Sequence, residues 1–159
     1  MVDLNTVSAA IGAATSAVGL IDKMADQIER FLTKQSQPAV PTEHRLKIEK
    51  EGDAIVSKNR GEERQRITAK DLEKLPHTSL RHIKVLEQSM ENHYTIWSAV
   101  YPQLALAVDP IAKAKTEQQL KEVVRSMKGD LDGILTFIEQ AGMYLDDHYL
   151  HIRSLVVQA

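Results

Sequence analysis

The sequence predicts a mainly α-helical protein, an antiparallel bundle of three to four long helices with a small β-hairpin or meander inserted at about residues 44–67. The first observation is that apolar residues recur at alternating steps of three and four along three segments. This spacing places them on one face of a helix. The second is a short stretch with a two-residue period, which is typical of a strand. Long seams of this kind predict helices that cross at shallow angles.

Composition limits the class of protein. The chain has 43% hydrophobic and 26% charged residues, as a soluble globular protein does, so we expect a single domain over residues 1–159. A net charge of −2 provides no field for nucleic acid, and we expect no such partner. The lack of cysteine excludes disulfides and thiolate catalysis. No lysine or arginine precedes Lys23, so the cationic start of a signal peptide is missing, and we expect a cytoplasmic location.

The clearest element is a long amphipathic helix over residues 4–34, in which a seven-residue apolar repeat continues for four heptads. No charged residue occurs between Asp3 and Asp22. A small-residue stripe runs beside the apolar seam and consists of Ser8, Gly12, Thr15, Ser16 and Gly19. Each glycine costs a helix about 1 kcal/mol relative to alanine. We therefore expect another backbone to approach the stripe, which is our candidate interaction surface.

A linker and a small sheet follow the first helix. Pro38 and Pro41 predict a linker over residues 35–42, because proline cannot continue a helical hydrogen-bond ladder. Residues 43–68 alternate apolar and charged side chains and contain turn signals at Gly52-Asp53 and Asn59-Arg60-Gly61. We predict strands at about 44–50, 54–58 and 63–67. A charged helix is the alternative, which the glycines disfavour.

Residues 69–157 are predicted to be helical. A short helix should end before Pro76, and the next, beginning at Thr78 or Ser79, should end or kink at Pro102. Its inner face carries Trp97, whose N–H needs a partner if it is buried. Asp109-Pro110 has the pattern of an N-cap with proline at the first helical position, and a restart near Thr116 is also compatible with the sequence. The final seam favours one helix over about 117–157, with two helices that break near Gly142 as the alternative.

The C-terminal segment contains the strongest candidates for a ligand or metal site. His148 is the only polar residue on the final apolar seam, and Asp147 and His151 lie within one turn of each other. Imidazole and carboxylate groups on one helical face can converge on a cation. The simpler interpretation is a buried, hydrogen-bonded histidine beside a surface pair of Asp147 and His151. No second element supplies evident ligands, so we predict no metal and no cofactor.

The first helix also permits a membrane role through residues 4–32. Its charge-free run of 18 residues is near the minimum for crossing a bilayer, and its small residues permit close helix contacts. In composition, this helix resembles the N-terminal helices of membrane-perturbing cell-death domains, the HeLo-type bundles and their bacterial counterparts. The resemblance covers about the first fifth of the chain. It implies a membrane-active helical bundle and assigns no site residues.

No catalytic constellation accompanies these patterns, since nothing identifies a nucleophile with an adjacent base. We therefore expect a non-enzymatic interaction or assembly protein that binds a protein partner or a second copy of itself as a homo-oligomer. A membrane-associated effector that acts through the first helix is one alternative. A small-ligand or metal binder at Asp147, His148 and His151 is the other.

Overall fold

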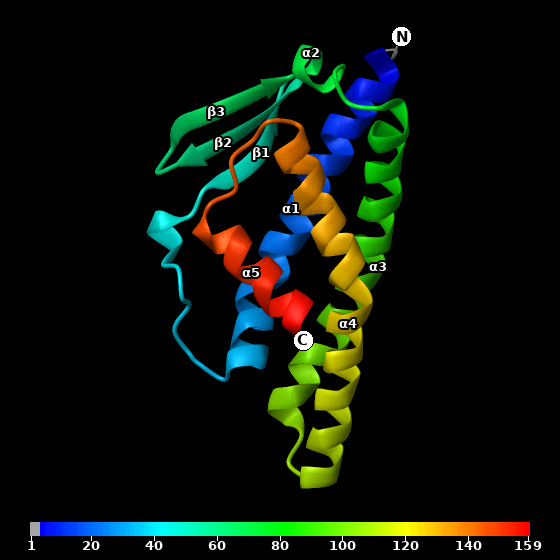
Figure 1. The fold of residues 1–159 in the computed structure, drawn as a ribbon. Coiled ribbons are helices and arrows are strands. Elements are labelled where there is room, and N and C mark those ends of the chain that lie inside the picture. Colours follow the sequence, from blue (N-terminus) through cyan, green and yellow to red (C-terminus); the bar gives the residue numbers. More distant parts are fainter. Residues whose placement is uncertain (1–3) are drawn as a thin grey trace.

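The computed structural model describes residues 4–159, which form five α-helices and one three-stranded antiparallel sheet (Figure 1). The predicted fold class, a helical bundle with an inserted β-meander, is confirmed. Residues 1–3, which the single-domain prediction included, lie outside the described residues.

Helix α1 (Leu4–Thr33) is the rod around which the other elements pack. Its apolar seam is buried against α3 and α4 on one side and against the sheet on the other, as Figure 1 shows. Ile11, Val18 and Ile28 are almost completely shielded from solvent. The heptad repeat therefore correctly identified both the helix and the face that it buries.

The sheet has strand order β1-β2-β3 and lies beside the N-terminal half of α1 (Figure 1). After a short 3₁₀ turn (Thr42–His44), the strands are β1 (Lys47–Glu51), β2 (Ala54–Asn59) and β3 (Glu62–Thr68). Ile55 pairs with Ile67 across β2 and β3, and both side chains are buried in the common core. Arg60 and Gly61 adopt positive φ angles of 53° and 80° at the β2–β3 turn. The predicted meander and its turns are confirmed.

Two helices follow the sheet. The short α2 (Ala69–Leu72) starts with a capping box between Thr68 and Asp71. Helix α3 (His77–Leu106) includes Pro102, so the helix does not end at this proline, and a kink there stays a prediction. The proline removes only its own amide donor, and the last turn continues past it, since the Ala107 amide still donates to Gln103 O over 3.0 Å. One turn earlier, Trp97 stacks on Tyr101 with ring centroids 5.2 Å apart. Trp97 also donates to Gln27 Oε1 over 2.8 Å, which supplies the expected partner for a buried indole.

The last third forms two helices, α4 (Pro110–Gln140) and α5 (Asp147–Gln158). Asp109 caps α4 as expected, and the helix continues through Thr116 without a restart. The favoured single helix over residues 117–157 is wrong, and the alternative break near Gly142 is correct. Gly142 has a φ angle of 102°, and the amide of Met143 donates to Ile138 O over 3.1 Å. This is a Schellman C-cap, which ends α4 and lets α5 fold back.

Gly142 should resist substitution, whereas Gly129 within α4 should not. An alanine at position 142 must adopt a positive φ, so Gly142→Ala should lower the free energy of unfolding by about 1–2 kcal/mol. Gly129→Ala is the matched control, because an added Cβ meets nothing within 4 Å there. It should raise the free energy of unfolding by about 0.5–1 kcal/mol. Urea denaturation measures both changes, and equal effects would contradict the C-cap assignment.

Candidate functional site

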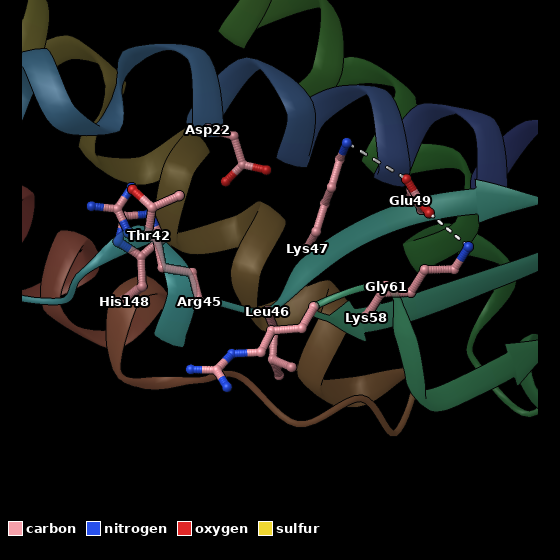
Figure 2. A pocket seen from close by; sticks show the side chains of 10 residues that line it. Asp22, Thr42, Arg45, Leu46, Lys47, Glu49, Lys58, Gly61 and His148 are labelled. Atoms are coloured by element: carbon pink, nitrogen blue, oxygen red, sulfur yellow. Dashed lines mark ion pairs between the residues drawn. The ribbon is translucent and has the colours of Figure 1, made fainter.

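A cavity of about 550 Å³ lies between α1, β1, the β2–β3 turn and the start of α5. Figure 2 shows Asp22 from α1, Lys47 and Glu49 from β1 and His148 from α5 around this space. Its volume is within the range of ordinary small-molecule sites. The lining is dominated by polar and charged residues: Asp22, Thr42, Arg45, Leu46, Lys47, Glu49, Lys58, Arg60, Gly61 and His148.

The Asp146 carboxylate connects two segments that form part of the cavity wall. Its Oδ1 accepts a hydrogen bond from the Tyr149 amide over 3.1 Å, which caps α5. Its Oδ2 accepts a second bond from the Leu46 amide, 2.6 Å away, at the entrance to β1. One buried side chain therefore links two segments that are 100 residues apart in sequence. This link fixes where His148 and Tyr149 lie relative to the sheet.

His148 is the most unusual group in the lining. The residue is only 3% exposed, and its ring makes no hydrogen bond to any residue of the described chain. Burial lowers the pKa of His148, and the nearby Arg45 guanidinium lowers it further. The ring is therefore neutral near pH 7 and offers one donor and one acceptor. Buried polar groups are normally paired, so this ring has hydrogen-bonding capacity to offer a ligand or water in the cavity.

Asp22 on α1 is exposed to the cavity and is hydrogen-bonded to Tyr149 of α5. The buried Tyr149 hydroxyl donates to Asp22 Oδ2 over 3.1 Å. Water in the cavity reaches the Asp22 side chain, but surrounding protein removes much of its solvation. This desolvation raises the pKa of Asp22 to about 7, despite the opposing effect of the Tyr149 hydroxyl. A carboxyl group with such a pKa can exchange a proton near neutral pH.

Cations outnumber anions in the lining, and two of them are available to a ligand. Arg45 is occupied by Val40 O at 2.9 Å and by Asp26 at 2.8 Å, and Lys58 is held by the β1 carboxylates Glu49 and Glu51. Lys47 has only a long contact of 3.8 Å to Glu49. Arg60 forms no ion pair with the described residues. The β2–β3 turn, whose sequence indicated a hairpin, thus also places a guanidinium without an ion pair in the lining of the cavity.

The three residues predicted as a ligand or metal site do not converge. Asp147 points into solvent at the start of α5, and His148 lines the cavity. His151 contacts Glu29 on α1, with Nε2 and Oε2 2.8 Å apart. Within residues 4–159, no cluster of three or more histidine, aspartate or glutamate side chains could hold a metal ion. Of the predicted trio, only His148 belongs to the cavity.

The small-residue stripe of α1 lies on the surface. Ser8 and Ser16 are exposed, and the Thr15 hydroxyl donates a hydrogen bond to Ile11 O over 2.9 Å. A Cβ added at Gly12 or Gly19 would meet no atom within 4 Å among the described residues. The expected close approach of another backbone therefore does not occur among residues 4–159. Contact with a second molecule through this stripe stays a prediction.

A second polar cluster joins α3 to α4 but lacks the geometry of a catalytic triad. Asp130 accepts hydrogen bonds from Ser89 and from His93, the latter over 2.9 Å. In a nucleophilic triad the histidine lies between the serine and the acid. Here the acid lies between the other two, so the histidine cannot remove the serine proton. This cluster is a hydrogen-bonded connection between the two helices.

Asp22 and Arg60 belong to the site but were not predicted from the sequence. Asp22 is the first charged residue after the charge-free run of α1, and Arg60 occupies a turn position where glycine and asparagine are favoured. Each residue is therefore unusual for its position in the helix or the turn, and this was recognisable in the sequence. No local sequence pattern indicated that the chain would bring the start of α5 close to these two residues.

Comparison with known proteins provides no further guide to this site: no protein family, curated protein or solved structure matches the chain.

The double link through Asp146 should be important for stability. Asp146→Ala removes the cap of α5 and leaves the Leu46 amide unpaired, which should lower the free energy of unfolding by about 2–3 kcal/mol. Asp146→Asn keeps one acceptor oxygen and should lose about half as much. Thermal and urea denaturation compare the two variants. A loss below about 0.5 kcal/mol for alanine would contradict this role.

The raised pKa of Asp22 predicts a specific pH dependence. Because the folded-state pKa of about 7 exceeds the unfolded value of 3.8, the folded protein binds more protons between these values, and stability falls as pH rises from about 4 to 7. Asp22→Asn should therefore stabilise the protein at pH 8, by about 1 kcal/mol since water reaches the group, and have little effect at pH 4. Denaturation at both pH values measures this difference. Equal effects would mean that the pKa is not raised.

Proposed function

We propose that this protein is a non-enzymatic binding protein whose cavity between α1, β1 and α5 takes a small organic anion. The observation that carries the proposal is the buried His148 ring, which lines the cavity without a hydrogen-bond partner in the described chain. The ring nitrogens are not among the buried side-chain atoms that lack a partner in the described chain, so they open into the cavity, where a ligand can reach them.

Charge supports an anionic ligand. Lys47 and Arg60 are the lining cations without a short ion pair among the described residues, and an arginine fork can hold a carboxylate or phosphate through two parallel bonds. Asp22 in its protonated form can donate a hydrogen bond to the same ligand. The neutral His148 ring adds a further donor or acceptor. The ligand should therefore combine an anionic group with a neutral polar part.

The lining favours binding over catalysis. Asp22 could act as a general base, but no serine, threonine or lysine nucleophile is hydrogen-bonded to it within the described chain. Its partner is a tyrosine hydroxyl, whose pKa is raised well above its usual value by burial, so the tyrosine keeps its proton.

Self-assembly through the small-residue stripe and membrane insertion through residues 4–32 remain separate predictions. Helix α1 is long and apolar enough to cross a membrane by length and composition alone. The apolar face of α1 packs in the core of the bundle, however, so insertion would require the helix to leave α3 and α4. The cavity requires no such rearrangement, and this is why we favour it.

The proposal predicts that anions bind more tightly below pH 7. Inorganic phosphate, succinate and adenosine monophosphate serve as probes in isothermal titration calorimetry with the full chain. Since ionised Asp22 repels an anion, affinity for the probes that bind should fall on the order of tenfold between pH 6 and pH 8. Asp22→Asn should keep only the pH dependence that comes from ionisation of the probe itself, since the second ionisation of phosphate and of adenosine monophosphate falls near this range. Failure of all three anions to bind wild-type protein, or equal affinity at both pH values, would contradict the proposal.

Two variants separate binding from folding. Arg60→Asn removes the guanidinium, while asparagine tolerates the positive φ of the turn, so affinity should fall at least about tenfold without loss of stability. Arg64→Asn on the neighbouring strand is the matched control, because Arg64 is outside the cavity lining and should not affect binding. His148→Leu should raise stability while it weakens binding, the trade-off expected of a residue kept for function. A loss of stability with unchanged affinity would identify His148 as merely structural.

A further inference from the structure

The turn between α3 and α4 exposes large apolar side chains at the free end of a helical hairpin. Leu106, Val108 and Ile111 are 76%, 96% and 79% exposed. They lie within six consecutive residues, and we call this segment, residues 106–111, the hairpin tip. Figure 1 shows the tip projecting beyond the end of α1 and beyond the C-terminus. Scattered exposed apolar residues are ordinary, but a cluster on a protruding tip indicates a partner.

Cations lie on the helices next to this tip. Lys113 and Lys115 follow Ile111 on α4 and are both exposed. The helical rise places them about 3 and 6 Å further from the tip along the axis. A cavity of about 560 Å³ between the ends of α1, α3 and α4 adds Arg30 and Lys34, together with the single acid Glu117. Asp109 is the one acid within the tip, and its carboxylate is used to cap α4.

This arrangement fits a lipid surface better than a protein partner. Stable protein interfaces bury about 800 Å² on each partner, far more than three side chains provide. An interfacial membrane contact instead needs apolar groups that enter by about 5–10 Å and cations at the height of the headgroups. Lysine side chains can extend along the surface to reach them. The order of the groups along α4, apolar side chains first and lysines next, matches that requirement.

We infer that the hairpin tip is a membrane contact, in which Leu106, Val108 and Ile111 enter the headgroup region of a membrane rich in anionic lipid and the neighbouring lysines bind its phosphates. The contact leaves the bundle folded and differs from insertion of α1. It is also independent of the cavity, which lies on the other side of α1 near the sheet.

The absence of cysteine from the chain permits a direct test with one fluorophore per molecule. Val108→Cys and Val85→Cys in the full chain each carry an environment-sensitive nitrobenzoxadiazole label, and Val85 is the matched control because it is an exposed valine on α3, away from the tip. Phosphatidylcholine vesicles with phosphatidylserine should brighten and blue-shift the label at position 108 but not at 85. Vesicles without phosphatidylserine should have a much smaller effect. No shift at position 108 on anionic vesicles would overturn the inference.

Sedimentation with the same vesicles tests each component without a label. A triple variant with serine in place of Leu106, Val108 and Ile111 should partition at least about tenfold less, and Lys113→Glu with Lys115→Glu should abolish the preference for anionic lipid. The matched control places serine at Val85, Ile96 and Val157, which are also exposed, and should partition like wild type. Circular dichroism confirms that each variant is folded. Wild-type partitioning by the tip variant, or a dimer in ultracentrifugation that only this variant loses, would show that the tip does not act on lipid.

Discussion

The position of the C-terminal helix depends on one buried carboxylate. Asp146 accepts a hydrogen bond from Tyr149 within α5 and another from Leu46 before β1. Gln65 reinforces the same connection, because its amide group bonds to Gly142 O and to the Tyr144 amide. The buried face of α5, with Tyr149, Ile152 and Val156, packs into the core. The hydrogen bonds join the start of the helix to the sheet, so that His148 lines the cavity.

The heptad seams predicted the helical segments correctly, because a seam marks the face of a helix that is buried. A seam does not indicate where the chain reverses its direction. Ala141, Leu145 and His148 continue the alternation of four and three across the break, so periodicity alone favoured one helix. The helix nevertheless breaks at Gly142, because glycine adopts at low energetic cost the positive φ angle that ends a helix. Pro102 shows the reverse case. There the helix continues for one more turn past a helix-breaking residue, and the Ala107 amide still donates to Gln103 O.

The candidate site was only partly predictable for the same reason. His148 was identifiable as a polar residue on an apolar seam. Its sequence neighbours Asp147 and His151 were the natural partners only if they faced the same way, yet one points to solvent and the other pairs with Glu29. The groups that do face His148 come from α1 and from the β-turn, brought there by a chain reversal that no local pattern encodes. A site made of distant segments requires the tertiary fold.

The two regions to which we assign functions present side chains of opposite character to their surroundings. His148 turns its ring to the cavity, and the hairpin tip holds large apolar side chains in water. The tip side chains contribute nothing to the core that the seams of α1, α3 and α4 form. Because α5 and the sheet form the cavity while the α3–α4 hairpin forms the tip, a change in one region can leave the other intact. The architecture therefore places the proposed ligand site and the proposed membrane contact on different parts of the fold, with α1 between them.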